Sequence, residues 1–404
     1  MKMRSIALLI LFTGFVACKN QQNVTSKQTE KPNYTAALPQ GKPALQRVTQ
    51  HNWPNIEHAW EARDLFLRDS IDNSIVWFDA PSSKQWFPIE GVTHEHAKNS
   101  IVEFRTIIIN ASTKEEFMTQ VRDRFDLYRS VGCDGEGTVL FTGYYAPDFH
   151  ASKSQSQTCH APLFERPEDL MTDAASGTPL GRKTPSGLIE PWPPRKELVD
   201  SGELDGTELV WVQDTLDAYT IHVNGSARLR MDSGELMYIG YAGKTDQPYT
   251  GLGHSVLEAG LLPPDTLSLR AIRRLYDKNP HRVNELISKN ESFVFFREYE
   301  GENWPAGSLG VPVTAERSIA TDKKIFPRGG IVLVDTTVRS LTGEKQTFTQ
   351  FMTDQDTGGA IRAPGRADLF MGVGPTAGIK AGGQYAEGQL YYLFLKPDSI
   401  ASIN

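Results

Sequence analysis

The chain has few cysteines, no clustering of basic residues and no apolar run long enough to span a bilayer. Its 404 residues include 3 cysteines and carry a formal net charge of −7. A nucleic-acid-binding face needs clustered Lys and Arg, so we exclude nucleic acid as a partner. No Cys/His spacing typical of a zinc site is present, and we expect no metal.

The N-terminus has the pattern of an export signal. Lys2 and Arg4 precede an apolar run from Ile6 to Val16, and Ala17-Cys18 follows. A positive start and a short apolar run are typical of a secretion signal, and this run is too short to cross a membrane. A cysteine after a small residue resembles a bacterial lipobox. We therefore expect residues 1–18 to be a lipoprotein signal peptide and Cys18 to carry a lipid. Lys19 favours the periplasmic face of the outer membrane. The alternative is a plain secretory signal with an incidental cysteine.

The next segment is polar, and the rest of the chain is too long for one typical core. Residues 19–50 have few large apolar side chains, so we expect a disordered tether there. The remaining length predicts two domains. In an exported protein Cys133 and Cys159 could form a disulfide, or they could be two unrelated thiols.

Short strands outnumber helices in the pattern of apolar residues. Thr113 and Glu116 form a capping box, and apolar residues then recur at helical spacing, which predicts a helix over 113–130. A second helix is predicted over 266–278. Strands are predicted at 139–141, 208–212, 218–223, 228–231, 237–241, 293–296, 331–334, 346–353 and 390–395. This pattern predicts a mainly β protein with β-barrel domains and a few helices.

One segment near the C-terminus combines acids with glycines. Asp356, Thr357, Gly358 and Gly359 are consecutive, and Arg366 and Asp368 follow. Paired glycines let a backbone approach a ligand or take a positive φ. The fold can shield an acid beside such a turn from water. This desolvation raises the pKa of the carboxyl toward neutrality, where it can serve as a general acid.

Two familiar acid chemistries have to be compared with this segment. Aspartic peptidases carry an Asp-Thr/Ser-Gly triplet in each of two lobes, and Asp232-Ser233-Gly234 is a second triplet here. Its surroundings differ from those of Asp356, and it has the composition of a turn between strands. A glycoside hydrolase would need a second carboxylate, for which Asp322, Asp354 and Asp368 are candidates.

A series of blocks in a fixed order carries a family resemblance. These blocks resemble those of the MltA-type membrane-bound lytic murein transglycosylases, which have a C-terminal 3D domain. The blocks are Gly143-Tyr144-Tyr145-Ala146-Pro147, Leu209–Asp214 with Asp217, Asn224–Ser226, Gly240–Gly243, Pro248-Tyr249, Asn290–Phe296, Arg317–Asp322, Gln355–Ile361, Arg366–Phe370 and Gly372–Gly374.

The resemblance implies a two-domain fold. A double-psi β-barrel is expected from 51–145 and 286–404, with a β-rich substrate-binding domain inserted at 146–285. Two blocks of the insert depart from the family pattern, at Asn224–Ala227 and at Thr245–Tyr249. The details of saccharide binding therefore depend on residues particular to this chain.

The resemblance also implies the reaction. A single aspartate, matched by Asp356, acts as acid and then as base in cleaving the MurNAc-β-1,4-GlcNAc bond of peptidoglycan, with formation of 1,6-anhydro-MurNAc. No cofactor is implied. The partners implied are glycan strands, with the membrane reached through Cys18, and we expect a monomer. A non-catalytic peptidoglycan-binding lipoprotein is the alternative. The expected substrate-binding residues are Tyr144, Tyr145, Ser226, Tyr249, Asp322, Thr357, Gly358, Gly359, Arg366 and Asp368.

Overall fold

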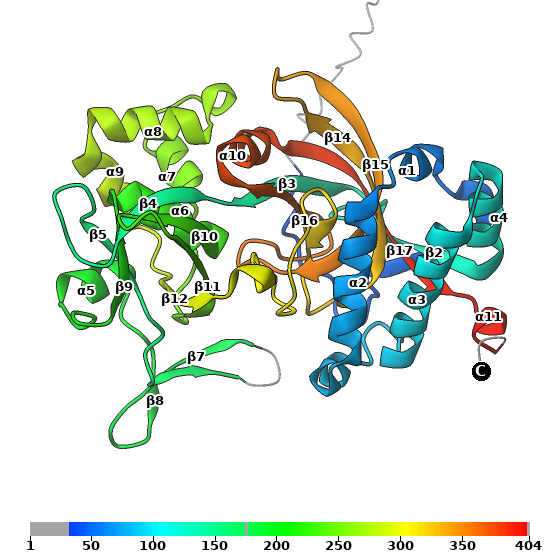
Figure 1. Ribbon diagram of the computed structural model, residues 1–404, viewed down its shortest axis with the longest axis horizontal. Coiled ribbons are helices and arrows are strands. Elements are labelled where there is room, and N and C mark those ends of the chain that lie inside the picture. Colours follow the sequence, from blue (N-terminus) through cyan, green and yellow to red (C-terminus); the bar gives the residue numbers. More distant parts are fainter. Residues whose placement is uncertain (1–31, 174–176, 402–404) are drawn as a thin grey trace, which may run out of the picture. The chain divides into compact units, whose positions relative to one another are not determined.

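A computed structural model describes residues 32–173 and 177–401 (Figure 1). The expected signal peptide, Cys18 and the first part of the expected tether lie outside these residues. The chain from Asn33 onward belongs to one structural unit. In the described ranges no helix combines the length and the apolar character needed to cross a membrane.

The larger sheet of this unit has eight strands. Their order is β1-β2-β17-β14-β15-β13-β16-β3, and β17 also pairs with β3. The strands from β17 to β3 therefore close into a six-stranded barrel, while β1 and β2 continue the sheet beyond it. The bounds are β1 Leu45–Val48, β2 Phe125–Ser130, β3 Val139–Ala146, β13 Ser318–Ala320, β14 Ile331–Arg339, β15 Lys345–Asp356, β16 Arg366–Val373 and β17 Tyr385–Leu395.

The barrel combines one strand from the first half of the chain, β3, with five strands that follow the second sheet in sequence. Strand β3 pairs parallel with β16, and β13 pairs parallel with β15. Parallel neighbours require long crossover connections, and the connection from β3 to β16 contains the entire second sheet. The expected class, a mainly β protein with a few helices, is confirmed. The crossed connections of a double-psi barrel stay a prediction.

Helices cover the outside of the barrel. Strand β14 starts with four buried residues in succession, because both of its faces are covered. Phe104 of α3 packs on Phe351 of β15 with ring centroids 4.9 Å apart. The helices of this part are α1 Glu57–Glu61, α2 Leu65–Asp79, α3 His94–Asn110, α4 Lys114–Arg124, α10 Gly374–Gly383 and α11 Pro397–Ala401, with 3-10 turns η1 Gln50–Asn52 and η2 Pro81–Trp86.

The helix predicted over 113–130 is correct only in its first part. Thr113 caps α4 by accepting from the backbone N–H of Glu116 at 3.2 Å. Helix α4 ends at Arg124, and Phe125 begins β2. Strand β2 pairs with both β1 and β17, so sheet pairing overrides the helical spacing of the apolar residues.

The expected tether also ends earlier than predicted. Residues 45–48 form β1, and Ala44 and Leu45 are buried. This polar segment is ordered because its backbone pairs antiparallel with β2.

The second sheet, which we call the insert sheet, has the order β12-β11-β10-β4-β9-β5. A small sheet, β6-β7-β8, accompanies it. The strands are β4 Asp148–Ser152, β5 Ala161–Phe164, β6 Leu170–Thr172, β7 Pro179–Lys183, β8 Ile189–Glu190, β9 Glu208–Val212, β10 Ser226–Met231, β11 Leu236–Lys244 and β12 Val294–Tyr299. The helices are α5 Arg195–Asp200, α6 Thr215–Asn224, α7 Leu252–Glu258, α8 Leu269–Lys278 and α9 Pro280–Ile287, with 3-10 turns η3 Pro264–Thr266 and η4 Gly301–Asn303.

Two expectations for this region differ from the structure. The strand predicted at 218–223 is wrong, because these residues lie in α6, which Asp214 caps by accepting from the N–H of Asp217 at 2.9 Å. Strand β12 pairs with β11, so the insert sheet continues to Tyr299, beyond the boundary expected at 285. The helix predicted over 266–278 is confirmed as α8.

Candidate active site

The acid of the Asp-Thr-Gly-Gly segment lies at the end of β15, where that strand meets β13. The side chain of Gln355 points into the core, where it donates to the Ser70 carbonyl at 2.7 Å and to the Ser74 hydroxyl at 3.0 Å. Successive side chains alternate across a strand, so the Asp356 carboxyl points away from that core. The hydrogen bonds that hold Gln355 in the core therefore also determine the direction in which the Asp356 side chain points.

Three donors hold the Asp356 carboxyl. Oδ2 accepts from the Tyr144 hydroxyl at 2.8 Å. Oδ1 accepts from the backbone N–H groups of Ser308 and Thr357, each at 2.8 Å. The donors come from β3, from the loop after η4 and from the acid's own loop, so three separate parts of the chain position one carboxyl group.

The environment of Asp356 favours its protonated form. Burial raises the pKa of the carboxyl above its ordinary value, although the hydrogen bonds from Tyr144, Thr357 and Ser308 act in the opposite direction. Asp356 is only half-buried, so it keeps access to solvent or substrate. A carboxyl that is partly desolvated and still accessible to a ligand is suited to proton transfer to a bound molecule.

Asp368 and Arg366 lie beside this acid on β16. The Asp368 carboxyl accepts from the Thr142 hydroxyl at 2.8 Å, and Arg366 donates to the same hydroxyl oxygen at 3.0 Å. Burial raises the pKa of Asp368 to about 6, and the charge of Asp356 contributes to the rise. Asp368 therefore interacts electrostatically with Asp356, and Arg366 is linked to Asp368 through the Thr142 hydroxyl.

Asp322 organises the loop that follows the acid. Its Oδ1 accepts from the N–H of Lys324 at 3.1 Å and its Oδ2 from the N–H of Ala363 at 2.9 Å. Both oxygens are used within the fold and the residue is buried. This geometry supports a loop-organising role for Asp322 over direct contact with a sugar.

Asp354 is enclosed in the core. It is fully buried, forms an ion pair with Lys323, and accepts from the hydroxyls of Thr321 at 2.7 Å and Tyr392 at 2.6 Å. A glycoside hydrolase could not use this carboxyl as its second group, because no substrate reaches it.

The second Asp-Ser-Gly triplet is a turn. It lies between β10 and β11, where the N–H of Gly234 donates to the carbonyl of Met231 at 2.8 Å, and Asp232 forms an ion pair with His150. Asp232 lies in a turn that joins two strands of the insert sheet, whereas Asp356 is part of the barrel. The geometry gives no support to an aspartic peptidase.

The paired glycines provide space rather than an unusual backbone conformation. Neither Gly358 nor Gly359 has a positive φ. A Cβ on Gly358 would lie 3.0 Å from Ile361, whereas one on Gly359 would meet only the ammonium of Lys244, at 3.8 Å. Thr357 fixes the turn through its hydroxyl, which donates to the Thr321 carbonyl at 2.8 Å. The exposed side of Gly359 is therefore open to a ligand.

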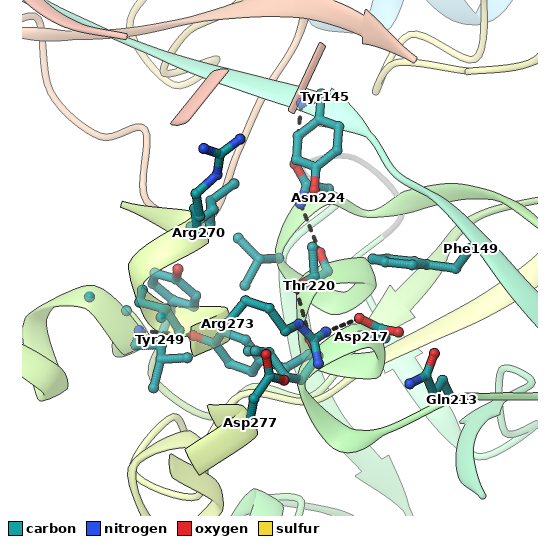
Figure 2. Close-up of a pocket in the computed structure, with 18 residues that line it drawn as sticks. Tyr145, Phe149, Gln213, Asp217, Thr220, Asn224, Tyr249, Arg270, Arg273 and Asp277 are labelled. Carbon is teal, nitrogen blue, oxygen red and sulfur yellow. Dashed lines mark hydrogen bonds and ion pairs between the residues drawn. The ribbon is translucent and has the colours of Figure 1, made fainter. Parts of the chain in front are cut away.

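A cavity of about 630 Å³ lies between β3 and helices α6 and α8 (Figure 2). It brings together Tyr145 and Tyr249, two of the expected substrate-binding residues. Burial raises the pKa of Tyr249, and the charge of Asp368 adds to the rise. The part of the cavity lined by Tyr249 therefore interacts electrostatically with Asp368. The lining residues are Tyr145, Phe149, Gln213, Leu216, Asp217, Tyr219, Thr220, Val223, Asn224, Tyr249, Gly251, Leu252, Gly253, Leu269, Arg270, Ile272, Arg273 and Asp277.

Ser226 and the two cysteines are further residues for which the sequence raised an expectation. Ser226 starts β10 and is buried, and it is not among the residues that line this cavity. Cys133 and Cys159 are both free thiols, so the possible disulfide between them is not formed.

Several residues of the site were missed in the sequence. Gly307 and Ser308 lie against β15, where a Cβ on Gly307 would come within 2.7 Å of the Gln355 carbonyl oxygen. Arg273 forms ion pairs with Asp214 and with Asp217, and the pair with Asp217 is drawn in Figure 2. Burial raises the pKa of Asp217 to about 7. The sequence signal for the loop was its composition, Pro305 to Gly310, which predicts a turn without showing what it touches.

Comparisons with known proteins agree with this geometry. The chain matches the MltA specific insert domain over residues 140–297 and the 3D domain over residues 317–394. It is 31% identical to membrane-bound lytic murein transglycosylase A of Vibrio cholerae over 66% of this chain and 68% of that protein.

Solved structures show the same fold. A membrane-bound lytic murein transglycosylase from Agrobacterium tumefaciens superposes with a TM-score of 0.71 at 24% identity, covering 89% of this chain and 99% of the other. E. coli MltA with bound chitohexaose superposes with a TM-score of 0.68 at 21% identity, covering 91% of this chain and all (100%) of the other.

Proposed function

Because the chain belongs to the MltA family of membrane-bound lytic murein transglycosylases, we propose that it cleaves peptidoglycan glycan strands with Asp356 as its single acid and base. The activity of a peptidoglycan lytic transglycosylase follows from the named relatives. The assignment of the chemistry to Asp356 is supported by its hydrogen bonds and its raised pKa.

The hydrogen bonds suggest which carboxyl oxygen exchanges the proton. Oδ1 accepts two backbone N–H groups, which occupy both of its lone pairs. Oδ2 accepts only the Tyr144 hydroxyl, so it can carry the acidic proton as well. We therefore assign proton transfer to Oδ2.

The reaction then balances without a second carboxylate. Asp356 gives its proton to the glycosidic oxygen while the bond from that oxygen to C1 of the muramyl sugar breaks. The C6 hydroxyl of the same sugar attacks C1, and its proton passes to the Asp356 carboxylate. The products are a 1,6-anhydro-MurNAc end and a free 4-hydroxyl on the neighbouring sugar. An oriented group on the same molecule has an effective molarity of about 10⁵ M or more, so no enzyme nucleophile is required.

The cavity supplies a surface for the sugar chain. Tyr145, Phe149 and Tyr249 offer aromatic faces, and Asn224 and Gln213 offer hydrogen-bonding groups. The E. coli relative was solved with a bound chitohexaose, which is a neutral sugar chain. We propose that this cavity holds part of the glycan, with Tyr249 as one of its lining residues.

The test is digestion of purified murein followed by mass spectrometry of the products. We expect 1,6-anhydro ends from the wild-type protein and none from Asp356→Asn with its fold retained. Reducing ends would instead show a hydrolase, and binding without products would show a wall-binding protein. Turnover that persists in Asp356→Asn would overturn the assignment of the acid.

The protein belongs to the cell envelope, as its membrane-bound relatives do. We further propose that Cys18 carries a lipid anchor at the outer membrane and that the enzyme is monomeric. Incorporation of labelled palmitate that is lost in Cys18→Ser tests the anchor. Light scattering of the protein without residues 1–18 tests the monomer, which a dimer mass would contradict.

A further inference from the structure

The last residue of β11 presents a cation to the loop that carries the acid. The ammonium of Lys244 lies 3.8 Å from the position that a Cβ on Gly359 would take. Gly359 follows Asp356 by three residues, so the two Cα atoms are at most about 11 Å apart. Lys244 therefore reaches from the insert sheet to the immediate surroundings of the acid.

This cation has no anion in the structure. Within residues 32–173 and 177–401, Lys244 is half-buried and forms neither an ion pair nor a side-chain hydrogen bond. Lys323, by comparison, is buried with a carboxylate partner, Asp354. A charge that is partly removed from water without a partner costs free energy, so its position requires an explanation.

A second cation, Arg362, is on the loop that Lys244 approaches, three residues after Gly359. Its side chain is exposed, and its one ion-pair contact among the described residues is at 3.8 Å from Asp322, whose carboxylate already accepts two backbone N–H groups. Burial, and then repulsion by Arg362, lower the pKa of Lys244. An anion bound between the two cations would relieve this repulsion.

We propose that Lys244 and Arg362 form a subsite for a carboxylate of the murein strand next to the bond that is cleaved. The inference rests on the proposed function, because it is the murein strand that brings an anion to this loop. The N-acetylglucosamine residues of the strand are neutral. The muramyl residue carries a lactyl carboxyl, which is free in strands without peptide and is replaced by the carboxylates of the stem in strands that bear peptide.

The expected contact is a charge-assisted hydrogen bond. An ammonium has three donors and no acceptor, and a carboxylate oxygen approaches it to about 2.7–2.9 Å. The open side of Gly359 leaves room for this approach, since a Cβ there would meet only Lys244. The subsite would make the enzyme prefer muramyl-containing strands over neutral chitin chains.

Binding measured without turnover tests the subsite. In an Asp356→Asn background, Lys244→Met is compared with the parent and with Lys244→Arg by calorimetry. The ligands are soluble strands with stems, strands whose stems an amidase has removed, and chitohexaose. Loss of a hydrogen bond to a charged group should weaken binding of a carboxylate-bearing strand about tenfold or more. Chitohexaose should bind unchanged, and Lys244→Arg should bind nearly as the parent does.

The outcomes separate the possible sources of the carboxylate. A loss confined to stem-free strands identifies the lactyl carboxylate, and a loss confined to stem-bearing strands identifies the peptide; either one supports the subsite. An equal loss for chitohexaose, or no loss for either type of strand, overturns it. Lys196→Met is the control for lost positive charge, because Lys196 is exposed and pairs with Asp200 on α5. If Lys244→Met does not fold, Lys244→Gln takes its place.

The proposed reaction is tested independently of the subsite. With Asp356 intact, Lys244→Met should raise KM for muramyl strands and leave kcat nearly unchanged, because the contact is present before and during the reaction. Absence of anhydro ends from the wild-type protein would contradict the proposed function, whereas the calorimetry would still decide whether a carboxylate binds.

Discussion

Tyr144→Phe should move the pH profile of the enzyme upward. The tyrosine hydroxyl donates to Asp356 Oδ2 at 2.8 Å, which favours the carboxylate and lowers the pKa of the acid. A hydrogen bond to a charged group is worth about 1.5–3 kcal/mol. One pKa unit corresponds to about 1.36 kcal/mol, so its loss should raise the pKa of Asp356 by about one to two units.

The sign of the effect on rate follows from the proposed role of the acid. Asp356 must be protonated to start the reaction, so activity falls as the pH rises through its pKa. In Tyr144→Phe this alkaline limb should lie about one to two units higher. The maximum rate should fall, because the phenylalanine no longer helps to hold the carboxyl in place.

The assay is the release of 1,6-anhydro ends from soluble glycan strands, with kcat/KM measured across the pH range, since this ratio reports the free enzyme. Tyr145→Phe is the matched control. It alters the neighbouring tyrosine of the same strand, which lines the cavity instead of binding the acid. An alkaline limb that stays in place or moves downward in Tyr144→Phe would refute the reasoning.

Three further changes test the surroundings of the acid. Asp368→Asn should remove a pH dependence of stability: burial raises the folded pKa from 3.8 to about 6, so the carboxylate costs at most about 3 kcal/mol once the pH exceeds 6. Urea unfolding should show less loss of stability between acid and neutral pH in the variant, and an equal loss would contradict this. Lys323→Met should cost about 3–5 kcal/mol of unfolding free energy because it leaves the buried Asp354 carboxylate without its cation. Adding Asp354→Asn should recover part of that cost, and simple additivity would exclude the coupling. Gly307→Ala should lower kcat about tenfold or more, because a Cβ 2.7 Å from the Gln355 carbonyl displaces the loop that donates to Asp356. Ser308→Ala keeps the donating N–H and should retain activity; an equal loss in both variants would assign the effect to the serine side chain.

Local patterns in the sequence predicted elements well where local physics dominates. The cap at Thr113 predicted the start of α4, and the apolar spacing of 266–278 predicted α8, which begins at Leu269 and ends at Lys278. Both succeeded because capping and amphipathicity depend only on near neighbours. The prediction failed at 125–130 and at 218–223. In the first case distant strands recruit the segment into a sheet, and in the second the cap at Asp214 starts a helix where the apolar pattern predicts a strand.

The proposed acid could be predicted from the sequence, but its environment could not. The Asp-Thr-Gly-Gly segment and the ordered blocks predict Asp356 as the acid. The Ser308 N–H, which donates to Asp356, and the Lys244 ammonium, which approaches Gly359, come from distant parts of the chain, and no spacing rule connects them to the acid. Asp322, Asp354 and Asp368 looked equivalent as acids. Burial and partners separate them into a loop organiser, a core ion pair and a neighbour of the acid.

By itself, then, the sequence determined the class of fold, the family and the acid-bearing segment, because motifs and periodicity are written in consecutive residues. Only the tertiary structure decided which groups surround the proposed acid, how far it is shielded from water and which cation has no anionic partner among the described residues. Hydrogen bonding, desolvation and Coulomb forces act over a few ångströms in space, and they depend on how distant segments pack rather than on their order along the chain.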